Sequence, residues 1–280
     1  MTTNHSEQKK KISILGCGWY GLALAKKLIE NGFTVNGSTT SSNKLTLLNE
    51  VGIKPFLINL SEKEIAYDAD FFNCAILCIA IPPKSNSPEL DSFITKIDAI
   101  ALAAEKARVE QIIFISSTGV YQDGNFIVDE TIIPEPQTAS GKTLLQAENI
   151  LKSNPSFTTT IIRFGGLIGP NRNLAKHFAG KKDISNGLAP INLIHLSDCI
   201  GLTEAIINQE AFGKTYHGVT PHHPSRKEFY TQACIASGFE EPYFIDELLD
   251  WKQIDSINVP TILAYNYEVK NWLEYGKVKH

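Results

Sequence analysis

The sequence lacks the features of a secreted, membrane-spanning or nucleic-acid-binding protein. Its five cysteines are scattered and odd in number, which suits reduced thiols in the cytoplasm better than a disulfide framework. Its longest apolar runs, such as 74–81, are far too short to cross a bilayer. With a net charge of −4 and no basic stretch beyond 9–11, the chain does not favour nucleic acid as a partner. These absences predict a soluble protein of the cytoplasm.

The chain has the length and composition of a globular α/β protein. Residues 1–10 are polar and have no apolar core, so we expect a disordered tail rather than a signal peptide. A chain of 280 residues can form one large domain with a smaller appendage and needs no disulfide staple. We find no internal repeat and no low-complexity linker.

Apolar runs typical of strands alternate with helical patterns up to residue 165. Several of these strands, including 75–79 and 112–115, are apolar throughout, as strands buried on both faces are. The pattern predicts a Rossmann-type α/β fold, a doubly wound parallel sheet between helical layers, over 11–165. The expected strands are 11–16, 33–38, 53–58, 73–80, 111–116 and 158–164, and the expected helices are 19–31, 43–51, 88–107 and 136–153.

Beyond residue 165 this alternation breaks and Gly and Pro become frequent, so 166–280 is expected to form a small C-terminal substrate or lid region. We expect about 188–210 to return to the Rossmann sheet through a strand at 191–195. Further helices are expected near 173–179, 197–209, 225–237 and 244–251.

The most informative motif is Gly16-Cys17-Gly18-Trp19-Tyr20-Gly21, which stands between the first strand and the first helix. Gly16 permits a tight turn, Gly18 lets the backbone approach a pyrophosphate, and Gly21 lets the helix pack near the strand. The free N–H groups at the start of that helix then face the phosphates. We therefore expect residues 16–21 to bind a dinucleotide.

The end of the second strand indicates which dinucleotide. An NAD site usually carries Asp or Glu there, whereas this chain has Ser38, Thr39, Thr40 and Lys44. Hydroxyl groups and a lysine can donate to a 2′-phosphate, so we favour NADP and keep NAD as the alternative. A second interpretation is that 38–43 only caps the following helix, where such residues are preferred.

Ligands of parallel sheets bind at the carboxyl ends of the strands, which directs attention to the loops after residues 16, 38, 80, 116 and 164. The loop Ala80-Ile81-Pro82 is expected against the adenosine half of the cofactor. The alternative is that proline only ends the strand there.

Three later segments resemble parts of the extended short-chain dehydrogenases/reductases. They are 115–121 with Ser116 and Ser117, 163–170 with Phe164 and Gly165, and 192–198. With the glycine motif, they make the chain similar to the NAD(P)-dependent epimerase/dehydratase superfamily, and most like its atypical YeeZ-like branch. The resemblance implies an oxidoreductase or epimerase on a small polar or nucleotide-sugar substrate, with Ser116, Phe164 and Gly165 at the cofactor.

The resemblance also implies a catalytic Ser, Tyr and Lys, in which lysine lowers the tyrosine pKa so that it can act as acid or base. Ser117 matches the serine, but the tyrosine and lysine positions hold Ser140 and Leu144. Two hypotheses therefore stay open. In one, Ser117 orients substrate while Tyr121, or a group of the substrate, supplies the acid. In the other, the protein is a catalytically inactive NADP(H)-binding redox sensor or scaffold.

Other reactive residues have simpler interpretations. Tyr121 can also pack beneath its loop, and Arg163 can meet either an anionic substrate or an internal partner. The adjacent His222 and His223 have no third ligand at a useful spacing, so no metal is expected. A helix N-terminus could lower the thiol pKa of Cys17, but a small residue that fits the phosphate turn is the preferred interpretation.

Overall fold

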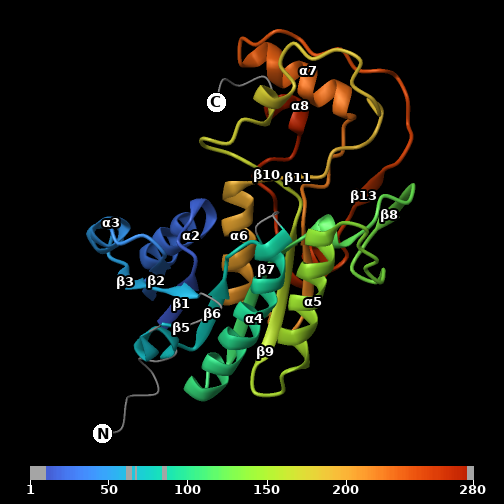
Figure 1. The fold of residues 1–280 in the computed structure, drawn as a ribbon. Helices are drawn as coiled ribbons and strands as arrows, with labels where there is room; N and C mark the ends of the chain where they lie inside the picture. Colours follow the sequence, from blue (N-terminus) through green and yellow to red (C-terminus); the bar gives the residue numbers. More distant parts are fainter. Residues whose placement is uncertain (1–10, 61–64, 67, 84–86, 276–280) are drawn as a thin grey trace, which may run out of the picture. The chain divides into compact units, whose positions relative to one another are not determined.

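The computed structural model describes residues 11–60, 65–66, 68–83 and 87–275 (Figure 1). The expected tail at 1–10 lies outside these residues. The chain divides into two compact units. Of the described residues, unit 1 holds those up to Val120 together with Pro136–Ile162 and Ile206–Thr215, and unit 2 holds Tyr121–Glu135, Arg163–Ala205 and those from Tyr216 onward.

The main sheet has seven strands in the order β12-β9-β7-β6-β1-β2-β3. Strand β1 pairs in parallel with β2 on one side and with β6 on the other, so the strand order reverses at β1. This confirms the predicted Rossmann-type fold and puts the ligand-binding crevice at the carboxyl ends of β1 and β6. The strands are β1 (Lys11–Leu15), β2 (Thr34–Thr39), β3 (Lys54–Leu57), β6 (Ile76–Ile79), β7 (Gln111–Ser117), β9 (Thr158–Phe164) and β12 (Thr215–Gly218).

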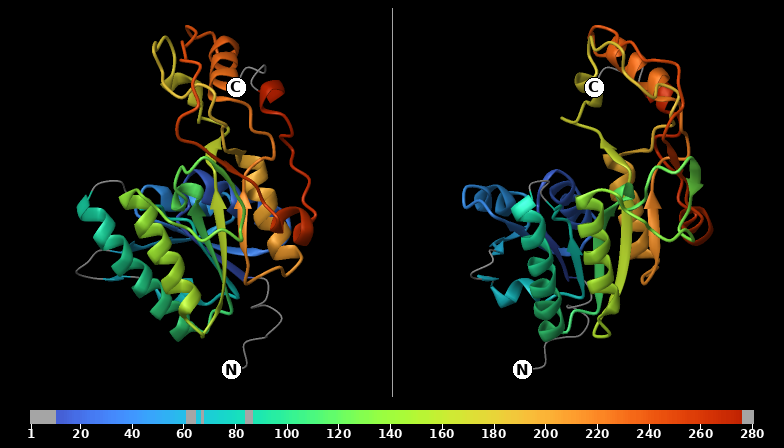
Figure 2. Two further views of the ribbon diagram at one scale, coloured as in Figure 1. Left: turned by 90° about the vertical axis from the view of Figure 1, so that its right-hand side faces the viewer. Right: turned by 45° about the vertical axis from the view of Figure 1, so that its right-hand side comes forward.

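Helices cover this sheet because their apolar faces match its apolar strands. Helices α4 (Ser87–Ala107) and α5 (Ala139–Ser153) lie side by side along the sheet (Figure 2). All four residues of β6 are buried, as the continuous apolar run predicts for a strand covered on both faces. The other helices of unit 1 are α2 (Trp19–Glu30) and α3 (Lys44–Glu50).

Unit 2 contains two small parallel sheets, each of two strands that are distant in sequence. Strand β10 (Gly166–Ile168) pairs with β11 (Leu193–His195), and β8 (Phe126–Val128) pairs with β13 (Lys252–Ile254). Helix α6 (Leu196–Asn208) follows β11, and α7 (Arg226–Ala236) begins with a capping box. The buried carboxylate of Asp198 accepts hydrogen bonds from the Glu268 and Val269 backbone and from the Tyr265 hydroxyl, which ties the C-terminal segment to α6.

Three features of unit 2 differ from expectation. The expected helix at 244–251 does not form, because its backbone bonds to a distant extended segment: the Ile245 amide donates to Ile184 and the Leu188 amide to Glu247. The segment 191–195 does not join the main sheet, because β11 pairs with β10. The strand that does join it is β12. The expected helix at 173–179 shortens to a 3₁₀ turn, Leu174–His177.

Candidate functional site

The glycine motif forms the tight turn that the sequence predicts between β1 and α2. Gly16 has a φ of +102°, a conformation that strongly favours glycine. A Cβ atom on Gly21 would lie 2.2 Å from the carbonyl oxygen of Gly16, so only glycine lets the helix approach this closely. At Gly18 a Cβ atom would meet nothing within 4 Å. Gly16 and Gly21 are therefore packed tightly against other protein atoms, whereas the space beside Gly18 is accessible to a ligand.

Helix α2 presents an uncapped N-terminus at this opening. Its N-cap residue is Gly18, which has no side chain to bond the first N–H groups, and its first turn contains no acidic residue. Trp19 and Tyr20 begin the helix, and Tyr20 is buried. The N–H groups at the start of a helix and the positive end of its dipole together suit an anionic phosphate. These features of the turn and the helix fit a pyrophosphate.

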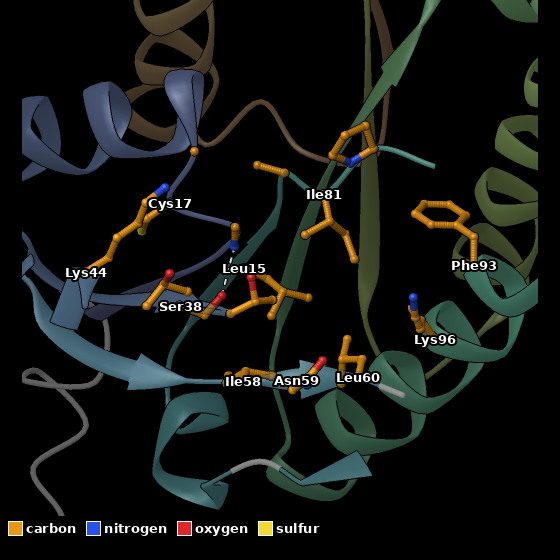
Figure 3. A pocket seen from close by; sticks show the side chains of 16 residues that line it. Leu15, Cys17, Ser38, Lys44, Ile58, Asn59, Leu60, Ile81, Phe93 and Lys96 are labelled. Carbon is orange, nitrogen blue, oxygen red and sulfur yellow. Dashed lines mark hydrogen bonds between the residues drawn. The ribbon is translucent and has the colours of Figure 1, made fainter. Parts of the chain in front are cut away.

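A cavity of about 500 Å³ adjoins this turn within unit 1. Figure 3 shows side chains that line it from β1, β2, α3, the residue after β3, the short strand β4 (Asn59–Leu60), the end of β6 and α4. Its volume falls within the range of small-molecule and cofactor sites, about 300–1,000 Å³. The residues that line the cavity are Leu15, Gly16, Cys17, Gly18, Ser38, Thr39, Thr40, Lys44, Ile58, Asn59, Leu60, Ala80, Ile81, Pro82, Phe93 and Lys96.

The residues expected to select the cofactor lie together at the end of β2. The Ser38 hydroxyl accepts a hydrogen bond of 2.9 Å from the Gly16 amide, which leaves its own proton free to donate. The Thr39 hydroxyl accepts from the Ser41 amide at 3.1 Å, while Lys44 is exposed at the start of α3. Helix α3 has Asn43 as its N-cap, with no side-chain hydrogen bond. Ser38, Thr39 and Thr40 line the cavity. The N-cap of α3 makes no side-chain hydrogen bond, so capping of this helix does not explain these hydroxyl groups.

The charged side chains described in the cavity wall are all positive. Its described lining residues include two lysines, Lys44 from α3 and Lys96 from α4, and no Asp or Glu (Figure 3). Sequence reasoning missed Asn59, Phe93 and Lys96. Asn59 follows β3, so the rule that ligands bind at strand ends could have found it. Phe93 and Lys96 stand on a helix distant in sequence and have no local signal.

Cys17 lines the cavity but is not a reactive thiol. Its side chain is buried, and this burial raises the pKa of the thiol to about 12. Desolvation therefore outweighs any effect of the helix N-terminus, and the thiol stays protonated near neutral pH. Its amide donates to the Ser38 carbonyl oxygen at 2.9 Å. Cys17 thus has the structural role that the sequence favours.

Strand β7, which ends with Ser116 and Ser117, and the turn that follows it pack against α5. The buried Ser116 hydroxyl donates to the Glu148 carboxylate at 2.5 Å. The half-buried Ser117 hydroxyl accepts from the Gly119 amide at 3.1 Å and retains its own proton for donation. A Cβ atom on Gly141 would lie 2.4 Å from the Gly119 carbonyl oxygen, so the loop and the helix meet closely. Ser117 can orient a polar group here.

The first turns of α5 do not contain a proton-transfer pair of tyrosine and lysine. Ser140 is half-buried, and its hydroxyl lies 3.4 Å from that of Thr138, the N-cap residue. Leu144 points into the core, with 9% of its surface exposed. A serine hydroxyl without a neighbouring base cannot replace a tyrosine whose pKa is lowered. The geometry therefore supports cofactor binding more directly than it supports the chemistry of the related dehydrogenases.

The remaining predicted site residues belong to unit 2. Tyr121 is buried, and its hydroxyl bonds to His217 Nε2 at 2.9 Å and accepts from the Arg163 guanidinium. These contacts fit the alternative in which Tyr121 packs beneath its loop and Arg163 has an internal partner. Phe164 and Gly165 are buried at the end of β9, where the Gly165 amide donates to Gly218. Their predicted role at the cofactor stays a prediction.

The described part of the chain offers no metal centre and no membrane span. None of its His, Cys, Asp and Glu side chains gather in threes around a possible ion position. His222 accepts from the Trp272 amide, and His223 bonds to the Ile191 carbonyl oxygen. No helix within the described ranges has the length and apolarity to cross a membrane.

Two comparisons by sequence find relatives of this chain. A sequence model of the family described as NAD(P)H-binding matches residues 16–189. The chain is 32% identical to the protein YeeZ of Escherichia coli K12 over 265 residues, which cover 92% of this chain and 96% of YeeZ.

Solved structures show the same fold at low sequence identity. The UDP-glucuronic acid 4-epimerase of Bacillus cereus in complex with NAD has a TM-score of 0.79 and 18% identity, covering 96% of this chain and 97% of that one. A conserved protein of unknown function from Silicibacter pomeroyi has a TM-score of 0.75 and 20% identity, and the match covers 96% of this chain and 97% of that one. At these identities the likeness extends to the fold alone.

Proposed function

This chain belongs to the NAD(P)H-binding family, and we propose that it binds NADP(H) in preference to NAD(H). The observation that carries the proposal is the cavity wall, which has two lysines and no carboxylate among its described residues. An acidic side chain at the end of β2 would accept from an unmodified ribose and would repel a 2′-phosphate. Ser38 and Lys44 instead offer a hydroxyl proton and a positive charge to that phosphate.

The experiment is a titration of the full chain with NADP⁺ and with NAD⁺ by calorimetry. We expect tighter binding of NADP⁺. Lys44→Ala should weaken NADP⁺ about tenfold, as loss of a charge-assisted hydrogen bond does, and leave NAD⁺ within about twofold. Lys142→Ala is the matched control, because Lys142 is exposed at the start of α5 and does not line the cavity. Equal affinity for the two cofactors, or equal losses in Lys44→Ala, would refute the preference.

We further propose that the bound cofactor is held without the proton transfer that tyrosine provides in related dehydrogenases, so that the protein acts as an NADP(H)-dependent sensor or scaffold. Ser140 and the buried Leu144 support this proposal. The second candidate is an oxidoreductase or epimerase on a small polar or nucleotide-sugar substrate. Two observations favour this second candidate. The Ser117 hydroxyl can still donate its proton, and the chain shares its fold with a UDP-glucuronic acid 4-epimerase.

A turnover assay separates these candidates. Sugar nucleotides and small carbonyl compounds are offered with NADP⁺ and with NADPH. Oxidation or reduction is followed by the absorbance of NADPH, and epimerisation, which consumes no cofactor, by chromatography of the sugar nucleotides. Turnover that is lost in Ser117→Ala supports the enzyme, whereas tight NADPH binding with no turnover across the panel supports the sensor. We also propose a cytoplasmic location, which the five free, buried thiols support.

A further inference from the structure

Two extended segments of unit 2, distant in sequence, lie side by side. Backbone hydrogen bonds join 180–188 to 240–247 along their length, and Ile184 pairs with Phe244 as residues of parallel strands do. Both segments belong to unit 2. We call this pair of segments the ribbon, with 180–188 as its first segment and 240–247 as its second.

Burial alternates along the second segment of the ribbon. Pro242 and Phe244 are buried, whereas Glu241, Tyr243 and Ile245 are exposed. The Phe244 ring packs on its aromatic neighbours within unit 2. A period of two is that of a strand with one covered face. The ribbon therefore has an inner face that packs on unit 2 and an outer face that is exposed.

Apolar side chains are exposed along the ribbon and just beyond its end. Tyr243 is 64% exposed and Leu249 is 52% exposed, and Leu188, Ile245 and Leu248 are exposed as well. The Leu249 amide is held beside the first segment, where it donates to a side chain of that segment at 2.9 Å. Single exposed apolar residues are common, but a contiguous strip that includes an exposed tyrosine is typical of a protein interface.

Charges of both signs stand at the beginning of the ribbon. Lys181 and Lys182 are exposed on the first segment, and Glu240 and Glu241 are exposed on the second. None of these four side chains forms an ion pair with another residue of the described chain. Asp183 follows the two lysines, so the beginning of the first segment keeps a net positive charge. The two segments thus offer opposite charges side by side.

A surface of this kind is complementary to a second copy of itself. A partner with charge of one sign would be repelled by half of these groups. A copy turned by 180° about an axis along the ribbon brings the first segment of each chain against the second segment of the other. Lys181 and Lys182 of one copy then face Glu240 and Glu241 of the other, and the apolar strips meet. We propose that the outer face of the ribbon is an interface between two copies of this chain.

The test is the oligomeric state of the full chain, measured by sedimentation velocity and light scattering. We expect a dimer whose dissociation constant rises at least about tenfold between about 50 mM and about 500 mM NaCl, because salt screens exposed ion pairs. The acidic variant, Lys181→Glu with Lys182→Glu, should dissociate because only carboxylates then meet at the interface. The basic variant, Glu240→Lys with Glu241→Lys, should dissociate for the converse reason.

The two variants also test the facing of the segments. An equimolar mixture of the acidic and basic variants should form a heterodimer, because every reversed pair then meets its opposite charge. Tyr243→Ser should weaken the natural dimer at least about tenfold through lost apolar contact. The matched control, Lys26→Glu with Lys214→Glu, reverses two exposed lysines of unit 1 and should leave the dimer unchanged.

Three results would overturn the proposal. They are a chain that stays monomeric up to about 100 µM, a dimer that the acidic and basic variants leave intact, and a mixture of these variants that does not associate. The substituted side chains of the ribbon are all exposed, so the urea midpoints of the variants should stay close to that of the natural chain. Because no cofactor enters these measurements, their outcome is independent of whether unit 1 prefers NADP.

Discussion

A methyl group added at Gly18 should weaken cofactor binding while the fold survives. An ideal Cβ atom there meets no atom within 4 Å, and the φ of −84° is open to alanine. The stability cost is therefore limited to the poorer helix N-cap, less than about 1 kcal/mol. The same methyl group would occupy the opening through which a pyrophosphate reaches the N–H groups of α2. Loss of even one charge-assisted hydrogen bond should weaken NADP⁺ at least about tenfold.

Gly21→Ala gives the contrasting result. Its Cβ atom would lie 2.2 Å from the Gly16 carbonyl oxygen, and backbone cannot yield as a flexible side chain can. Overpacking of this kind costs about 1–3 kcal/mol, so this variant should lose stability as well as affinity. Gly32→Ala serves as a control for lost stability alone, because Gly32 has a φ of +84°, which alanine adopts only at a cost, and it lies outside the cavity.

The assay is urea unfolding paired with calorimetric titration of NADP⁺ for the three variants. The reasoning predicts that Gly18→Ala separates the two readouts and that Gly21→Ala does not. A Gly18→Ala protein that binds NADP⁺ as tightly as the natural chain would refute the placement of the pyrophosphate at this turn.

Three further predictions concern the surroundings of the site. Ser116→Ala should lower the unfolding free energy by about 1–3 kcal/mol, because it removes a hydrogen bond from the buried Glu148, and an unchanged urea midpoint would contradict this. Leu144→Lys should lower the unfolding free energy by more than about 2 kcal/mol, because it buries an unpaired charge. Leu144→Met should lower it by less than about 1.5 kcal/mol, and equal urea midpoints for the two variants would contradict the burial of Leu144. Burial lowers the pKa of both His217 and His223, so the unfolded chain takes up protons first as the pH falls below about 6.5. The unfolding free energy should then fall with pH by up to about 1.4 kcal/mol per unit for each histidine between pH 6.5 and the lower pKa of the folded state, and a flat urea-unfolding profile from pH 7.5 to 5.5 would contradict this.

Local patterns were sufficient to predict six of the seven strands of the main sheet and the tight turn at 16–21. The apolar run of β6 and the spacing of Gly16, Gly18 and Gly21 each specify their structure within a few residues. The end of β2 was predictable for the same reason, since it follows directly from the position of the strand. Each of these features depends on close neighbours in the chain.

Features that depend on distant partners were not predictable in this way. The segment 244–251 has a helical apolar pattern, but its backbone bonds to 184–188 instead. Strands β8 and β13 are three residues each and pair across more than a hundred positions. Lys96 enters the cavity from a helix whose own pattern only indicates burial.

A structure of the full chain with NADPH tests the central claim most directly. The account predicts the pyrophosphate against the N–H groups that follow Gly18 and the 2′-phosphate within hydrogen-bond distance of Lys44 and the Ser38 hydroxyl. A 2′-phosphate that contacts neither residue, or a pyrophosphate bound away from the turn at 16–21, would contradict it.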